Sequence, residues 1–168
     1  MKKPTGMPRA LVLALAPLLL VCGCQQDMQA AEEGAATAAK KVLIAGTASE
    51  FKAKVVEGIV SRLGTKDYYL RIIGLDALEK EDAGSFGAVL LVNACMAGKM
   101  DGRVTRFLSK NPSNPKVIVF TSRGGEGKPI DLAAGVRVDA VSSVSPAGDA
   151  GKKADELAAL IRARFATP

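Results

Sequence analysis

Short apolar runs alternate with longer amphipathic stretches from residue 41 to the end of the chain. The runs are rich in β-branched residues and predict buried strands over residues 41–46, 68–74, 87–92, 116–121 and 136–144. Apolar side chains recur at steps of four between residues 50 and 63, which predicts a helix that ends at Gly64. Further helices are predicted at 98–110 and 151–165. This alternation is typical of βαβ units around a parallel sheet.

Two segments between these elements leave alternatives open. Residues 76–82, DALEKED, fit either a helical turn or a loop. The Gly-rich residues 122–135 stand where another helix is expected, so that helix is short, shifted or absent.

The first residues have the pattern of an export signal. Lys2, Lys3 and Arg9 precede an apolar run at residues 11–21, which is too short to span a bilayer as an ordinary transmembrane helix. We therefore expect residues 1–23 to be a signal peptide.

The end of this leader, Val21-Cys22-Gly23-Cys24, resembles the lipobox of bacterial lipoproteins. The resemblance implies that Cys24 becomes the lipidated first residue of the mature protein, with membrane lipid as its partner. The alternative is a plain signal peptide that ends near two cysteines. In the lipoprotein sorting pattern Asp after the lipidated cysteine retains the protein at the inner membrane. Gln25 at this position therefore implies the periplasmic side of the outer membrane.

Residues 24–40 are predicted to be a lipidated, flexible tether, because they are small and polar and have no apolar period. A flexible chain of this length reaches roughly 20 to 25 Å. Residues 41–168 then form one domain.

Charge and composition exclude several functions. Removal of residues 1–23 takes away three basic residues and no acids, so the net charge falls from +6 to +3. With only two Tyr and five Phe to stack on bases, nothing indicates nucleic-acid binding. The chain has no His, which excludes a Ser-His-Asp triad and His-containing metal sites. Cys95 is the remaining free thiol, either redox-active or, as expected, a buried inert residue. No catalytic residue or metal site is therefore predicted.

The order of the elements, with polar or Gly-rich loops after the first, third and fourth strands, resembles the flavodoxin family over residues 41–166. Residues 97–100 with the helix behind them, and residues 138–145, are the most similar stretches. The resemblance implies a three-layer α/β sandwich with a five-stranded parallel sheet in order 2-1-3-4-5. A ligand crevice is then expected at the carboxyl ends of strands one, three and four.

In that family the loop after the first strand holds the phosphate of FMN. Here Thr47 and Ser49 keep hydroxyl groups, and Lys52 adds positive charge. Glu50 replaces the family's glycine and is expected either to occupy the anion site or to repel phosphate, by on the order of 4 kcal/mol at 4 Å. The alternative is that Ser49 is simply a helix cap and Glu50 a first-turn acid.

The resemblance places the flavin ring against the other two loops. Met96 stands where the family has an aromatic side chain, and Gly98 follows in the same loop. The loop after the fourth strand offers donors for a flavin edge or another flat polar ligand, or is only a surface turn: Thr121, Ser122, Gly124 and Gly125.

These features predict a membrane-anchored, flavodoxin-like lipoprotein with a degraded FMN site, which serves as a binding or envelope-associated module without a tightly bound cofactor. The alternative is a flavodoxin-type electron carrier at the cell envelope. It would hold the FMN phosphate with Thr47, Ser49 and Lys52, and the ring with Met96 and residues 121–125.

Overall fold

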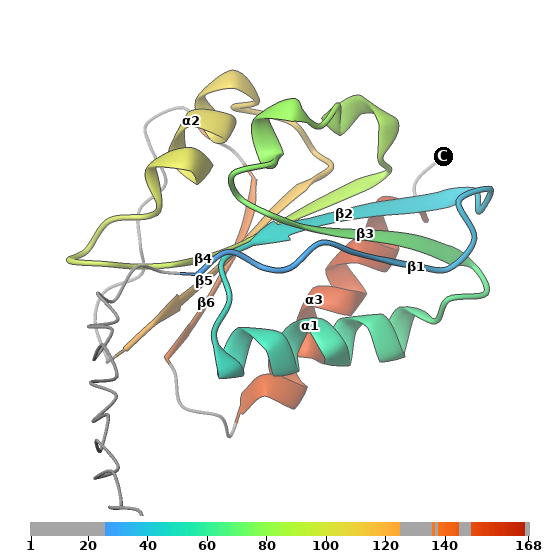
Figure 1. Cartoon of the computed structure of the whole chain (residues 1–168), viewed down its shortest axis with the longest axis horizontal. Coiled ribbons are helices and arrows are strands. Elements are labelled where there is room, and N and C mark those ends of the chain that lie inside the picture. The colour runs from blue at the N-terminus through green and yellow to red at the C-terminus, as the bar shows by residue number, and fades with distance from the viewer. Residues whose placement is uncertain (1–25, 125–135, 137, 145–148, 167–168) are drawn as a thin grey trace, which may run out of the picture.

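The computed structural model describes residues 26–124, 136, 138–144 and 149–166. A six-stranded sheet forms the middle layer; α1 and α3 cover one face, and α2 with two 3-10 turns covers the other (Figure 1). Cys24 and Gly125 lie outside the described residues. Within the described ranges, no helix has the length and hydropathy needed to cross a membrane.

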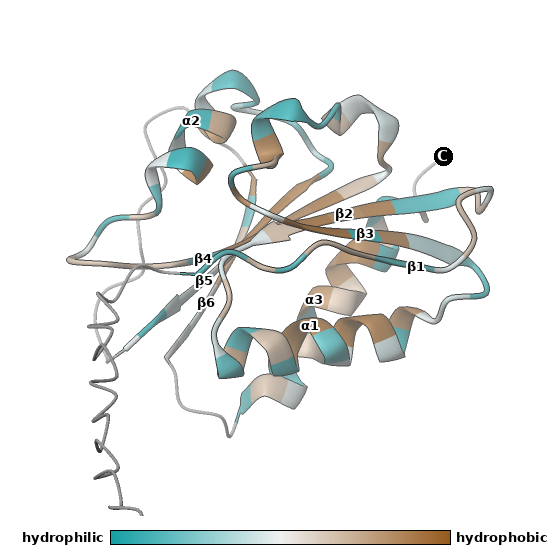
Figure 2. Ribbon diagram, in the orientation of Figure 1, coloured by the Kyte–Doolittle hydropathy of each residue, from teal (hydrophilic) through white to brown (hydrophobic). Residues whose placement is uncertain are grey.

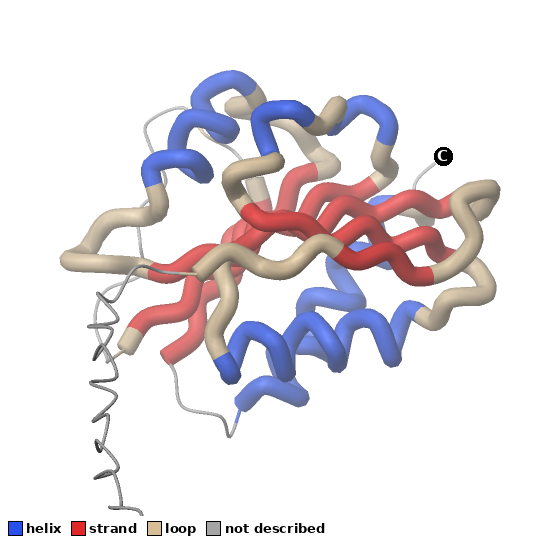
Figure 3. The backbone as a smooth tube through the Cα atoms, in the orientation of Figure 1, coloured by secondary structure: helices blue, strands red, loops and turns tan. Residues whose placement is uncertain are grey.

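The strands are β1 Ala31–Glu33, β2 Lys40–Gly46, β3 Tyr68–Gly74, β4 Ala88–Ala94, β5 Val117–Arg123 and β6 Asp139–Val144. The helices are α1 Glu50–Leu63, α2 Gly102–Lys110 and α3 Ala150–Arg164, and the 3-10 turns are η1 Leu78–Lys80 and η2 Ala83–Ser85. The segment 76–82 therefore contains a helical turn, one of its two expected states. Figure 3 shows these elements by type.

The strand order is β1-β3-β2-β4-β5-β6, which corrects the predicted five strands in order 2-1-3-4-5. Strands β2 to β6 pair in parallel, and the sixth strand, β1, pairs antiparallel with the edge of β3. This strand comes from the segment 24–40 that was expected to be a flexible tether. An edge strand offers unpaired backbone groups to any extended segment, so β1 needs no apolar period to join it. Glu32 also pairs with Arg71 across the two strands at 2.5 Å.

The central strands are buried on both faces, as expected for a parallel sheet covered by helices. Alternate residues enter different cores: Val42 and Ile44 pack toward α1 and α3, whereas Leu43 and Ala45 pack toward α2. Figure 2 shows the hydrophobic sheet between the helices.

Helix α1 has the predicted bounds, because its buried stripe and the Gly64 cap both appear in the sequence. Helix α2 begins at Gly102 rather than at residue 98. The four residues at 96–99 instead close a tight turn, and Asp101 then caps the helix by accepting a hydrogen bond from Arg103 N at 2.9 Å.

Candidate functional site

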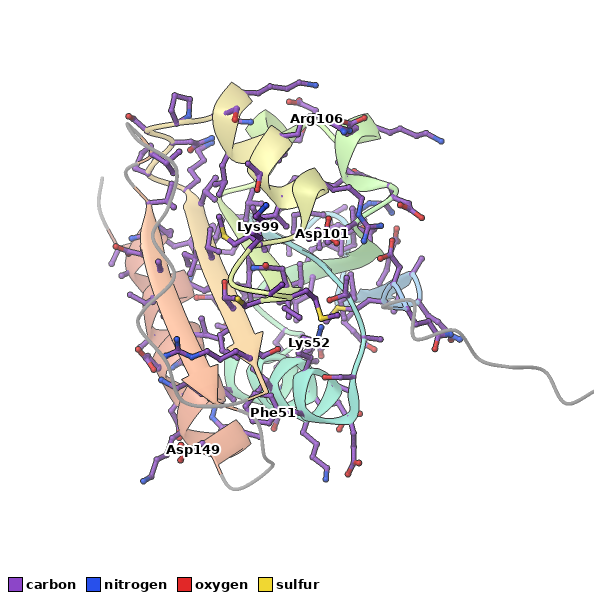
Figure 4. The ribbon with its side chains drawn as sticks, turned by 90° about the vertical axis from the view of Figure 1, so that its left-hand side faces the viewer. Phe51, Lys52, Lys99, Asp101, Arg106 and Asp149 are labelled. Atoms are coloured by element: carbon purple, nitrogen blue, oxygen red, sulfur yellow. The ribbon has the colours of Figure 1, made fainter. Side chains whose placement is uncertain are left out.

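The carboxyl ends of β2, β4 and β5 meet at one end of the sheet, which faces the viewer in Figure 4. A pocket of about 240 Å³ opens there, lined by Ala48, Ser49, Lys52, Ala94, Cys95, Met96, Ser122, Arg123 and Gly124. The fold thus brings five of the predicted site residues together: Ser49, Lys52, Met96, Ser122 and Gly124. Thr47, Gly98 and Thr121 do not line this pocket.

The loop after β2 starts α1 with a side-chain cap. Ser49 is extended, with φ −161°, and its Oγ accepts a hydrogen bond from Lys52 N at 3.2 Å. Glu50 points away from the pocket: its side chain is 82% exposed and accepts from Lys54 Nζ at 2.7 Å, which lowers the pKa of the Glu50 carboxyl. The expectation that Glu50 fills the anion site is therefore wrong. Residues four apart are neighbours on a helix surface, so Lys54 holds this carboxylate in solvent.

Lys52 is the most buried charged side chain at this end of the sheet, with 2% of its surface exposed. Its Nζ donates a hydrogen bond to Oγ1 of Thr47, which is completely buried. Burial lowers the pKa of Lys52 to about 8, and the negative charges of Asp101 and Asp27 oppose that shift. Lys52 thus remains mostly protonated at neutral pH.

Residues 26–28, which we call the N-terminal strap, cross the end of β2. Gln26 O accepts a hydrogen bond from Ala48 N at 2.6 Å, and Met28 N donates to Gly46 O at 2.9 Å. Asp27 forms an antiparallel bridge with Thr47 between these two bonds. The strap therefore covers the backbone of the loop that was expected to bind phosphate.

An arginine of α2 ties the strap to the rest of the site. Arg103 Nη1 lies 3.0 Å from Asp27 Oδ2 and 2.5 Å from Asp76 Oδ1, and Nη2 lies 2.8 Å from Asp101 Oδ2. The guanidinium lowers the pKa of the Asp101 carboxyl, and this hydrogen bond is also the largest influence that raises the pKa of Arg103. Sequence reasoning missed this cluster, because Asp27 and Asp76 lie far along the chain from Asp101 and Arg103 and share no motif with them.

The loop after β4 is a two-residue hairpin. Met96 and Lys99 exchange backbone hydrogen bonds of 2.9 and 3.0 Å, and Ala97 and Gly98 between them have φ of +49° and +78°. Two successive positive φ values are typical of a type I′ turn, which explains Gly98 without a ligand. Met96 is 59% exposed, the one exposed large hydrophobic side chain among the described residues. Cys95 is only partly buried, not fully buried as expected for an inert thiol.

Polar side chains also join β4 and β5 beneath the pocket. Asn93 is completely buried, and its Nδ2 donates to Thr121 Oγ1 at 2.9 Å and to Phe120 O at 3.2 Å. Thr121 therefore links two strands. Within the described part of the chain, no group of His, Cys, Asp and Glu side chains has the arrangement of a metal site.

No protein-family model and no curated protein sequence matches the chain. Solved structures do share its fold. A flavodoxin from the domain Archaea superposes with a TM-score of 0.55 at 15% identity, over 74% of this chain and 99% of that one. Flavodoxin 2 from Bacillus cereus gives 0.55 at 14% identity over 74% and 99% of the two chains. The WrbA-like protein from Agrobacterium tumefaciens gives 0.53 at 13% over 77% and 99%. The chain therefore has a flavodoxin-like α/β fold.

Proposed function

We propose that the protein is a lipid-anchored envelope protein whose flavodoxin-like domain has lost tight FMN binding and serves as a binding module at the membrane surface. The leader and the lipobox-like Val21-Cys22-Gly23-Cys24 support the anchor at Cys24. Gln25 supports an address on the periplasmic side of the outer membrane.

The N-terminal strap is the observation that best supports the loss of tight FMN binding. A phosphate at the start of a helix is bound by free backbone N–H groups and hydroxyls. Here Ala48 N already donates to Gln26 O, and the Thr47 hydroxyl is buried against Lys52. Ser49 Oγ accepts from Lys52 N as a helix cap. A phosphate would have to displace these internal contacts before it gained its own.

The opposite side of the pocket also lacks what a flavin ring requires. Met96 supplies no aromatic face, and its side chain is mostly in solvent. The pocket of about 240 Å³ is smaller than the roughly 300 to 1,000 Å³ usual for small-molecule sites. The described walls therefore suit a smaller ligand than FMN.

A flavodoxin-type electron carrier is the second candidate. It is favoured by Lys52 and the hydroxyl-bearing residues Ser49 and Ser122, which line one pocket beside the first turn of α1. A cation and the positive end of a helix both attract a phosphate. In this candidate, the strap moves aside when FMN binds.

An absorbance spectrum and an FMN titration of the mature protein separate the two candidates. We expect colourless protein and weak binding at most. A bound flavin after purification, or tight binding on reconstitution, would make the protein an electron carrier.

The anchor is tested independently with Cys24→Ala in the full chain. We expect the variant to leave the detergent phase on partitioning and to lack the added mass of the lipid. A variant that stays in the detergent phase would refute anchoring through Cys24.

A further inference from the structure

The N-terminal strap limits which face of the domain an anchor at Cys24 can bring to a membrane. We propose that the carboxyl end of the sheet lies against the lipid bilayer, with the tip of the 96–99 hairpin in the interfacial layer. This inference rests on the lipidation of Cys24 in the proposed function. It goes beyond that function because a long flexible tether would leave the orientation free.

The first argument is the length of chain between the anchor and the crevice. Gln26 is bonded through its carbonyl to Ala48 N, and Cys24 is two residues upstream. An extended chain spans at most about 3.6 Å per residue, so the Cα of Cys24 lies within about 7 Å of that of Gln26. The lipid therefore begins next to this end of the sheet, not at the roughly 20 to 25 Å that a free tether would allow.

The strap has little slack, since bonds on both sides of Asp27 hold it. Met28 N donates to Gly46 O, and the Asp27 carboxylate pairs with Arg103. Farther along, β1 is paired with β3. The anchor thus pulls on the carboxyl end of β2 and cannot swing to the amino end of the sheet while these bonds persist.

The second argument is the chemistry of the hairpin at the same end. Figure 1 shows that the described chain starts at the end of the sheet where the loop between β4 and α2 projects. The tip consists of Met96, Ala97, Gly98 and Lys99, all exposed, and none carries a negative charge. At a membrane surface, Met96 can enter the acyl boundary while the ammonium of Lys99 stays among the headgroups.

The surrounding charges indicate an apolar contact and not an electrostatic one. The exposed carboxylates of Glu50 and Asp76 lie at the same end of the sheet, with side chains 82% and 84% exposed. Each is paired with a cation, Glu50 with Lys54 and Asp76 with Arg103, so these two cations are already engaged and do not attract anionic lipids. A contact made by the anchor and Met96 should therefore form on uncharged phosphatidylcholine and resist salt.

Fluorescence quenching by lipid tests the orientation on the complete lipidated protein. In a Cys95→Ser background, Ala97→Cys places a bimane label at the hairpin tip, and Thr65→Cys places it at an exposed position between α1 and β3. The labelled proteins are added to phosphatidylcholine vesicles with brominated acyl chains. We expect at least threefold stronger quenching at position 97 than at position 65, unchanged in 0.5 M NaCl.

A third variant tests the short link itself. Ten Gly and Ser residues inserted between Gln25 and Gln26 should reduce quenching at position 97 to that at position 65, because the anchor no longer holds the crevice at the lipid. Quenching that survives the insertion would overturn the role of the short link.

The remaining outcomes separate the orientation from the anchor. Equal quenching at positions 97 and 65 in protein that floats with the vesicles would overturn the orientation and leave lipidation intact. Protein that does not float, with no lipid mass on Cys24, would overturn the proposed function itself. A change at position 97 that depends on protein density and not on bromine would indicate contact with a second copy, and would also overturn the proposal.

Discussion

Asp27 Oδ2 lies 3.0 Å from Arg103 Nη1, an ion pair that joins the N-terminal strap to the first turn of α2. The same carboxylate oxygen accepts a hydrogen bond from Asp76 N at 2.9 Å. Both side chains of the pair are mostly shielded from solvent, with exposed fractions of 21% for Asp27 and 27% for Arg103. Shielding reduces screening by water, so this pair contributes more to the position of the strap than a surface ion pair would.

Asp27→Ala should loosen the strap without unfolding the domain. The variant loses the ion pair and the hydrogen bond that the Asp76 amide donates to the Asp27 carboxylate, at a local cost of about 1 to 3 kcal/mol. We expect amide exchange of Met28 and Ala48 to accelerate about tenfold or more. Asp76→Ala is the matched control, because Asp76 also pairs with Arg103 but is 84% exposed and outside the strap. Equal acceleration in both variants would show that Asp27 does not hold the strap.

FMN affinity should respond to the strap and to Met96, and hardly at all to Glu50. Asp27→Ala loosens the strap, so a phosphate can compete more easily with Gln26 O for Ala48 N. Met96→Tyr adds a ring face worth about 0.5 to 1.5 kcal/mol. We expect each change to tighten weak FMN binding several-fold in a fluorescence titration. Glu50→Gly should leave it within about twofold, because this carboxylate is neutralised by Lys54 in solvent. A large gain in FMN affinity in Glu50→Gly would instead show that Glu50 repels the phosphate, as expected from the sequence.

Gly46→Ala should destabilise the domain because the backbone of β4 passes too close. A Cβ at this position would lie 2.5 Å from Val92 O and 2.7 Å from Val92 Cβ. We expect a loss of about 1 to 3 kcal/mol in the free energy of unfolding, measured in urea. Gly102→Ala is the control: it lies in the first turn of α2 with open space around it, and should stabilise by up to about 1 kcal/mol. If the urea midpoint of Gly46→Ala were unchanged, β2 and β4 would be able to separate locally and make room for the added methyl group.

The stability of the protein should depend on the titration of Lys52 in alkaline solution. Its pKa falls from 10.5 to about 8 on folding, since burial disfavours the ammonium. Between pH 8 and 10.5 the unfolded chain therefore binds more protons at this residue than the folded one, and the free energy of unfolding rises with pH. The burial penalty is present in full below pH 8 and vanishes above 10.5.

Lys52→Met isolates this contribution from other groups that titrate in the same range. Relative to Lys52→Met, the wild type should gain stability between pH 8 and 10.5, by on the order of 3 kcal/mol at 1.36 per pKa unit. Lys54→Met, at a half-exposed position on the same helix, is the matched control for the loss of a lysine. If the free energies of unfolding of the wild type and Lys52→Met changed in parallel with pH, burial would not lower the pKa of Lys52.

Local patterns in the sequence were sufficient to predict elements whose structure depends on residues close together in the chain. The stripe from Phe51 to Leu63 predicted α1 with its correct bounds. Hydroxyl chemistry also predicted the Ser49 cap, one of the two alternatives weighed for this residue. The parallel α/β class followed from the alternation of such elements, because a parallel sheet requires a crossover between successive strands. The flavodoxin-like arrangement was an expectation from the resemblance to that family.

The candidate site depended on partners that no local pattern identifies. Residues 26–33 are polar and were expected to be flexible, yet the end of β2 and the edge of β3 supply the backbone partners that order them. Glu50 pairs with Lys54 outside the pocket. Lys52, which was expected to offer its charge to a phosphate, is buried and donates a hydrogen bond to Thr47. The sequence by itself determined the three helices and the five parallel strands to within about four residues, since their periodicity is local. Only the tertiary structure decided which charges and backbone groups meet at the carboxyl end of the sheet, since these contacts join segments up to 76 residues apart.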